Sequence, residues 1–181
     1  MFELNRAKPA KSHHSSFPQI GIDQGENQLT ELSAAVLRHL PLLEQLLLGG
    51  KWSPTRSIVA GNRITELGAI FGHNEQLQVI DFSSNRLQKI DRATFAGLKK
   101  LRWLSLGWNK LTTIPTVTFQ GLEQLQTLNL YRNKLTTIPA GTFQGLGQLQ
   151  TLNLWSNEMT TILAGTFQGL EQLQTLNLEW N

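Results

Sequence analysis

Cysteine is absent from the 181 residues of this chain. Its absence excludes a disulfide framework, a cysteine-based zinc site and a thiol nucleophile. The first sixteen residues, MFELNRAKPAKSHHSS, have no apolar run of the kind found in secretory signals. No stretch approaches the ~18–20 apolar residues of a membrane span. These absences favour a cytoplasmic protein, or a bacterial effector exported without a standard signal peptide.

Catalytic groupings are also missing from the sequence. His39 and His73 have no evident serine or aspartate partner, and no glycine-rich phosphate loop precedes a helix. His13 and His14 are adjacent but have no further ligands with metal-site spacing. We therefore expect no enzymatic activity, no cofactor and no metal. One enzyme hypothesis stays open, in which this chain is a fragment whose catalytic domain lies beyond Asn181.

The chain does contain a repeat. Leucines 101, 125 and 149 begin three closely similar copies spaced 24 residues apart, and a fixed period of this size indicates a solenoid. In the copy that begins at Leu125, Leu128 and Leu130 alternate with polar residues, which predicts a short strand with one buried face. Successive strands are expected to stack in parallel about 5 Å apart.

The rest of each copy predicts how the chain turns and returns. An asparagine ends every strand, and asparagine side chains commonly bond the backbone groups that a turn leaves unpaired. We expect a buried asparagine ladder of Asn85, Asn109, Asn133, Asn157 and Asn181. Pro139 and Gly141 favour an irregular or 3₁₀ return rather than a long helix. The return side should also bury a stack of Phe95, Phe119, Phe143 and Phe167.

The skeleton L-x-x-L-x-L-x-x-N-x-L, with its later Phe and Leu, resembles the longer, extracellular-style unit of the leucine-rich repeat family. The resemblance implies an α/β solenoid, a curved horseshoe with a parallel concave β-sheet and an irregular, 3₁₀ or short helical convex side. It also implies a protein or peptide ligand on the concave sheet. Extracellular animal members usually carry cysteine-rich caps, which this chain lacks.

The repeat divides the chain into an arm and a solenoid. Residues 1–16 are polar and basic, and we expect a flexible arm or cap; residues 17–181 form the solenoid. The predicted units start at 17, 43, 77, 101, 125 and 149, and a half unit covers 173–181. The unit at 43 contains an insertion, 49–61, whose role stays open. Trp52, within it, either pins this loop or anchors a partner.

The first unit is the most divergent. In it we predict a helix over Ser33–Leu40, while a competing interpretation joins Thr30–Leu48 into one capping helix kinked at Pro41. The half unit at the other end stops in a strand with an open edge. This favours a longer solenoid, or self-association through that strand.

Candidate binding residues come from the outward positions of the strands. We predict that Trp108, Tyr131, Trp155 and Trp180 form one stripe, flanked by Trp103 and Arg132. Trp, Tyr and Arg dominate the energetics of protein interfaces, so these six are the predicted ligand-binding residues. The alternative is that the rings stack on each other and only cover the sheet. The outward threonine and asparagine rows are expected to be self-satisfying ladders.

Charge supports a second function hypothesis. The net charge is +3, and a basic belt at 86–110 contains Arg86, Lys89, Arg92, Lys99, Lys100, Arg102 and Lys110. Either this belt is a solvated convex face, or it binds a nucleic acid or anionic surface. The preferred function is a non-catalytic module binding a protein or peptide on the concave face. A nucleic-acid partner is disfavoured, and a third alternative is the recognition part of a longer receptor or effector.

Overall fold

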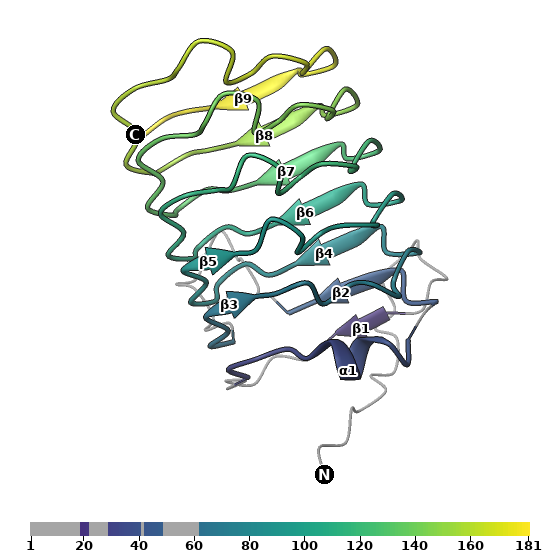
Figure 1. Ribbon diagram of the computed structural model, residues 1–181. Helices are drawn as coiled ribbons and strands as arrows, with labels where there is room; N and C mark the ends of the chain where they lie inside the picture. Colours follow the sequence, from purple (N-terminus) through teal and green to yellow (C-terminus); the bar gives the residue numbers. More distant parts are fainter. Residues whose placement is uncertain (1–18, 22–28, 41, 49–61) are drawn as a thin grey trace, which may run out of the picture.

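The computed structural model describes residues 19–21, 29–40, 42–48 and 62–181. These residues form a solenoid whose strands stack along one side (Figure 1). The predicted arm 1–16 and the insertion 49–61 lie outside the described residues.

One parallel sheet runs the length of the described chain. Its seven strands stand in the order β1 (Gln19–Gly21), β2 (Gln45–Leu47), β4 (Val79–Asp81), β6 (Trp103–Ser105), β7 (Thr127–Asn129), β8 (Thr151–Asn153) and β9 (Thr175–Asn177). The register never slips, so that Leu104 pairs with Leu128, and Leu128 with Leu152. The prediction of one strand per unit, stacked in parallel, is confirmed.

The divergent first coil follows the same plan. Ile20 of β1 pairs with Leu46 of β2. The helix α1 (Ala34–Leu37) is shorter than predicted, and its N-cap Ser33 accepts a hydrogen bond of 3.1 Å from the Ala35 N–H. The competing single helix over Thr30–Leu48 is wrong, because β2 occupies part of that range and buries Leu46 in the core.

The return side begins with a small sheet that the sequence did not predict. Strands β3 (Glu66–Leu67) and β5 (Lys89–Ile90) pair in parallel, and the Asp91 N–H extends the pairing by donating to the Leu67 oxygen at 3.1 Å. In the next two coils this position holds Pro115 and Pro139, which have no N–H to donate. There the chain returns through turns, as predicted, and α1 is the only α-helix among the described residues.

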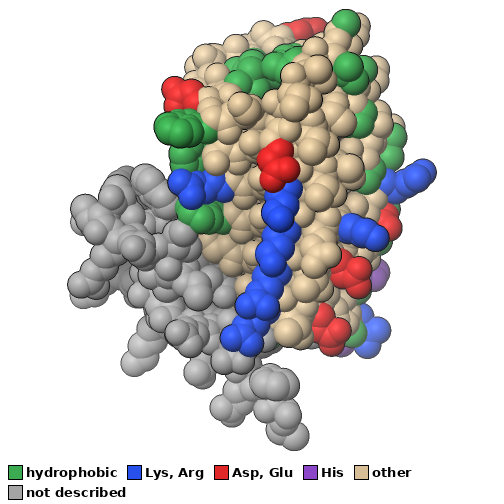
Figure 2. Space-filling model, turned by 90° about the vertical axis from the view of Figure 1, so that its left-hand side faces the viewer, with side chains coloured by type: hydrophobic (Ala, Val, Ile, Leu, Met, Phe, Trp, Pro, Cys, Tyr) green, Lys and Arg blue, Asp and Glu red, His purple; other side chains and the backbone are tan. Residues whose placement is uncertain are grey.

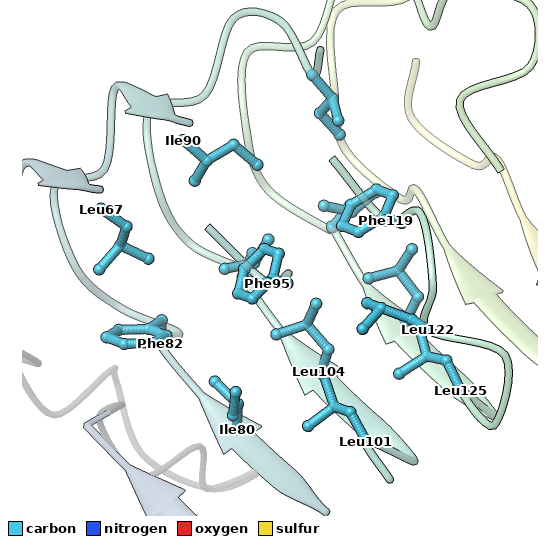
Figure 3. Close-up of a cluster of buried hydrophobic side chains, with 14 of the residues drawn as sticks. Leu67, Ile80, Phe82, Ile90, Phe95, Leu101, Leu104, Phe119, Leu122 and Leu125 are labelled. Atoms are coloured by element: carbon cyan, nitrogen blue, oxygen red, sulfur yellow. The ribbon is translucent and has the colours of Figure 1, made fainter. Parts of the chain in front are cut away.

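The core lies between the sheet and the return turns. Strand leucines such as Leu104 face phenylalanines from the return side (Figure 3). The ring centres of Phe95 and Phe119 are 6.2 Å apart and those of Phe143 and Phe167 are 6.3 Å apart. The predicted stack is confirmed, and Phe71 extends it by one coil. Because each unit buries its apolar residues against the next, neighbouring coils stabilise one another.

The asparagine ladder connects the coils on the inner side of the turn. The Asn109 amide donates at 3.0 Å to the Leu106 oxygen of its own coil and to the Phe82 oxygen of the preceding coil. Its Oδ1 accepts from the Leu87 N–H at 2.9 Å. Equivalent bonds recur at Asn85, Asn133 and Asn157, and in part at Asn181. The ladder is confirmed as a structural element.

Candidate functional site

The candidate site lies where the strands end. The residue before each ladder asparagine adopts a left-handed backbone, with φ from 50° to 59° at Ser84, Trp108, Arg132, Ser156 and Trp180. Such a conformation is unusual for a bulky side chain and is kept only where the surroundings impose it. The Trp108 N–H donates to the Tyr131 oxygen at 2.9 Å, and the Arg132 N–H to the Trp155 oxygen at 2.8 Å. These bonds fix the backbone from which the side chains project.

A cation between two indole rings forms the centre of the site. The guanidinium carbon of Arg132 is 4.0 Å from the ring centre of Trp108 and 4.5 Å from that of Trp155. Both distances are within the range of cation–π attraction. Arg132 was predicted to flank an aromatic stripe. It instead lies against two of the rings, Trp108 of the preceding coil and Trp155 of the following one.

Tyr131 extends this arrangement over the sheet. Its ring centre is 6.3 Å from that of Trp155, with the two planes tilted by 38°. The ring lies across Gly107 of the preceding coil, where a β-carbon would overlap it. Burial raises the pKa of Tyr131 above its ordinary 10.0, with the charge of Asp81 adding to the rise and that of Arg132 opposing it. The hydroxyl is therefore neutral near pH 7 and can donate a hydrogen bond.

The row of acidic and amide side chains beside the cluster fixes the strand ends. Asp81 is half-buried; burial raises its pKa above 3.8, and hydrogen bonds from Ser83 oppose the rise. Its Oδ1 accepts from the Ser83 N–H at 2.8 Å. Asn153 likewise accepts from the Trp155 N–H at 3.0 Å. These side chains bond within their own coil.

Two predicted site residues stand apart from the others. Trp103 is half-buried on β6, at the start of the strand that precedes Trp108. Trp180 is 79% exposed. Within the part of the chain that the structure describes, neither ring joins the aromatic and cation contacts of the centre. We call Trp108, Tyr131, Arg132 and Trp155 the aromatic cluster.

The structure also brings basic side chains together in a grouping that differs from the predicted belt at 86–110. Asn62 takes the ladder position one coil before Asn85, since its amide donates to the Leu48 oxygen and its Oδ1 accepts from the Leu29 N–H. The residue that follows each ladder asparagine from Asn62 to Asn157 is exposed, and its backbone N–H donates to the preceding coil at 2.7–3.0 Å. Four of these residues are basic, and we call them the cation column: Arg63, Arg86, Lys110 and Lys134. The next residue in the row is Glu158. Figure 2 shows such a column of Lys and Arg side chains with an acidic side chain at one end.

The predicted basic belt at 86–110 is not one surface. Arg86 and Lys110 belong to the cation column, but Lys89 lies in β5, and Lys99 lies in a return turn. The prediction grouped charges by their distance along the chain, whereas a solenoid groups them by their position in the repeat. The available signal was the basic residue that follows the ladder asparagine in four units.

The described residues contain no group of three His, Cys, Asp or Glu side chains suited to a metal ion. In that same part of the chain, no helix is long and apolar enough to cross a membrane.

Comparison with known families and structures identifies the repeat. A leucine-rich repeat model matches residues 58–111, 104–159 and 124–181. The chain belongs to the leucine-rich repeat family. These repeats are generally protein-interaction modules, and proteins built from them are typically non-catalytic.

Solved structures agree with the fold. A leucine-rich repeat protein of Leptospira interrogans is 30% identical with a TM-score of 0.70, and the match covers 86% of this chain and 36% of that protein. A crystal structure of a TLR13–ssRNA13 complex is 24% identical with a TM-score of 0.58, covering 86% of this chain and 23% of the other. This chain therefore spans about a third and a quarter of their lengths. Comparison with curated proteins gave no match.

Proposed function

We propose that this leucine-rich repeat chain is a non-catalytic interaction module that binds a protein or peptide through the sheet face and strand ends around the aromatic cluster. The observation that carries the proposal is the environment of the Arg132 side chain. Its guanidinium lies between two indole rings, and its Nε is buried without a hydrogen-bond acceptor among the described residues.

The chemistry of this arrangement suits recognition. The indole rings contact the guanidinium from the two neighbouring coils and restrict its movement. The terminal N–H groups of an arginine can bond a carboxylate or carbonyl oxygen of a ligand. The partly exposed rings of Trp108, Tyr131 and Trp155 offer apolar contact area around this charge. Buried aromatic anchors next to arginine are the usual centres of binding energy in protein interfaces.

The alternative, that the rings only cover the sheet, explains the cluster less well. Tyr131 and Trp155 do contact each other, as that role requires, but Arg132 separates Trp108 from Trp155. In our proposal Trp103 and Trp180 contribute at the periphery. The belt hypothesis for a nucleic acid or anionic surface loses support because its residues are on different sides of the solenoid.

The test uses affinity capture with two triple variants. Trp108→Ala/Tyr131→Ala/Trp155→Ala removes the cluster, and Thr127→Ala/Thr151→Ala/Thr175→Ala alters the same number of outward residues on β7, β8 and β9. Circular dichroism first verifies that both variants are folded. We expect partners captured by the parent chain and the threonine variant to be lost by the cluster variant. Equal capture by all three chains would contradict the proposal.

A further inference from the structure

The cation column is a continuous charged edge of the solenoid. The Lys110 N–H donates to the Leu87 oxygen at 2.8 Å, and the Lys134 N–H to the Leu111 oxygen at 2.9 Å. These bonds place each column residue beside the column residue of the preceding coil. Adjacent coils in a parallel sheet are about 4.8 Å apart, and four of them span roughly 15 Å. All four column side chains are exposed.

The column concentrates charge of one sign. Stacked cations repel each other, and an opposite charge placed along the row would relieve that repulsion. Glu158 follows Lys134 in the row, and Glu179 follows Trp155 by one coil in the row of Tyr131. Both acidic residues lie toward β9, so a negatively charged ligand is attracted to the coils of β2, β4, β6 and β7 and repelled beyond them.

The column and the aromatic cluster lie next to each other at the strand ends. Trp108 and Lys110, like Arg132 and Lys134, are separated only by the ladder asparagine, whose side chain points into the core. Beside the column, the face in Figure 2 carries hydrophobic side chains on either side of a cationic one. One ligand therefore reaches both surfaces.

We propose that the partner of this module presents an extended acidic peptide segment that lies along Arg63, Arg86, Lys110 and Lys134, while an adjoining part contacts the aromatic cluster. This inference rests on the proposed function and specifies the chemical class of the partner. In an extended strand, side chains on one face recur at roughly 6.6–6.8 Å, and the long stems of Lys and Arg span the difference from the coil spacing.

An acidic peptide fits this edge better than a single-stranded nucleic acid. Nucleic-acid binders of this type offer free aromatic faces on which bases stack. Here Arg132 covers one face of Trp108 and also a face of Trp155, which is in addition contacted by Tyr131. The column is also one side chain wide and four charges long, which is short for a phosphate-binding surface.

The test measures fluorescence anisotropy of labelled 12-residue peptides at about 20 mM salt, where surface charges are weakly screened. The probe is (Glu-Ser)6, and its neutral counterpart is (Gln-Ser)6. The column variant Arg86→Gln/Lys110→Gln/Lys134→Gln is compared with Arg92→Gln/Lys99→Gln/Lys100→Gln, which removes one arginine and two lysines from the return turns.

We expect (Glu-Ser)6 to bind the parent chain and (Gln-Ser)6 not to bind. The column variant should weaken binding at least about 10-fold, because it removes three of the four charges that attract the peptide along the row. The matched variant should weaken it less than about 3-fold. Equal effects of both variants would overturn the assignment to the column.

A second probe distinguishes the ligand classes. The oligonucleotide (dT)7 carries six phosphodiester charges, matching the six glutamates. If (dT)7 binds more tightly than (Glu-Ser)6 and loses affinity in the column variant, the column binds nucleic acid and our proposal is wrong. Failure of the column leaves the proposed function standing, because capture by the aromatic cluster is measured separately with the cluster variant.

Discussion

At the residue scale, one position in the repeat carries three kinds of side chain in the described coils. The left-handed residue is serine in two described coils, tryptophan in two others and arginine at position 132. The backbone is the same in all of them, so the scaffold presents whichever side chain the sequence places there. Among the described residues, a buried, unpaired guanidinium nitrogen occurs only where tryptophan, arginine and tryptophan meet across three coils.

The first residue-scale prediction concerns Arg132. Replacing it with glutamine removes the positive charge and both cation–π contacts. We expect affinity for a captured partner to fall by at least 10-fold, or about 1.4 kcal/mol, as for other arginines at interface centres. Titration calorimetry would measure it, with the exposed Arg102→Gln as control. Unchanged affinity in Arg132→Gln would remove this residue from the site.

The second concerns Asp81. Burial raises its folded pKa above 3.8, so its ionisation opposes folding once the pH exceeds the unfolded pKa. The same strand position holds asparagine in β7, β8 and β9. Asp81→Asn should therefore raise the free energy of unfolding at pH 7, on the order of 0.5–2 kcal/mol as for other consensus substitutions.

The gain from Asp81→Asn should disappear below the unfolded pKa, where the aspartate is neutral in both states. Urea unfolding at pH 7 and near pH 3 would measure both effects. Asn153→Asp, the reverse change in β8, is the matched variant and should lower stability at pH 7 only. A gain from Asp81→Asn of equal size at both pH values would show that desolvation of the carboxylate is not its cause.

At the element scale, the space between adjacent strands decides where the aromatic rings lie. Tyr131 lies across the end of the preceding strand because Gly107 has no side chain there. This is a property of a pair of strands, since the glycine and the ring belong to different coils. The pairing of β3 with β5, which the sequence did not predict, also depends on two neighbouring coils. It occurs where no proline interrupts the pairing.

Gly107→Ala tests this relation. The added methyl group would overlap the Tyr131 ring, so the ring must move toward solvent. We expect the pKa of Tyr131 to return toward 10.0 and the partner affinity to fall. The chain has one tyrosine, so ultraviolet titration reports on it alone. Gly147→Ala, where a β-carbon meets no atom, should change neither quantity. A tyrosine pKa that does not move in Gly107→Ala would refute this account.

At the scale of the whole molecule, the solenoid is stabilised by contacts between successive coils. Its sheet contains only parallel pairs in strict register, and its phenylalanine stack runs from Phe71 to Phe167. In such a structure the stability of a coil depends on how many neighbours cover it. Phe119 has a ring on each side, while Phe167 has one stacking neighbour among the described residues and is half-buried.

Phenylalanine truncations should therefore have unequal effects. Phe119→Ala is expected to lower the free energy of unfolding by about 3–5 kcal/mol, the usual cost of removing a fully buried ring. Phe167→Ala should cost clearly less because part of that ring is already exposed. Chemical denaturation followed by circular dichroism would measure both. Equal losses of unfolding free energy would indicate that the coils unfold as one unit and that a coil's stability does not depend on its number of neighbours.

The repeating features of this protein follow from the sequence alone. The strand in each unit, the asparagine ladder and the phenylalanine stack all come from a 24-residue period in which the same residue type returns to the same place. The division into units starting at 17, 43, 77, 101, 125 and 149, with the half unit at 173, stays a prediction. The period is sufficient to predict these features because identical units, once stacked, all bury their apolar faces in the same way.

The non-repeating features were decided by the tertiary structure. The place of Arg132 between two indole rings, the position of Tyr131 over Gly107 and the alignment of the cation column all join residues about 24 positions apart. Their relation depends on the exact register between coils and on left-handed turns at bulky residues, neither of which has a local signal. The sequence determines how each coil is built, and the stacking of the coils determines which side chains meet.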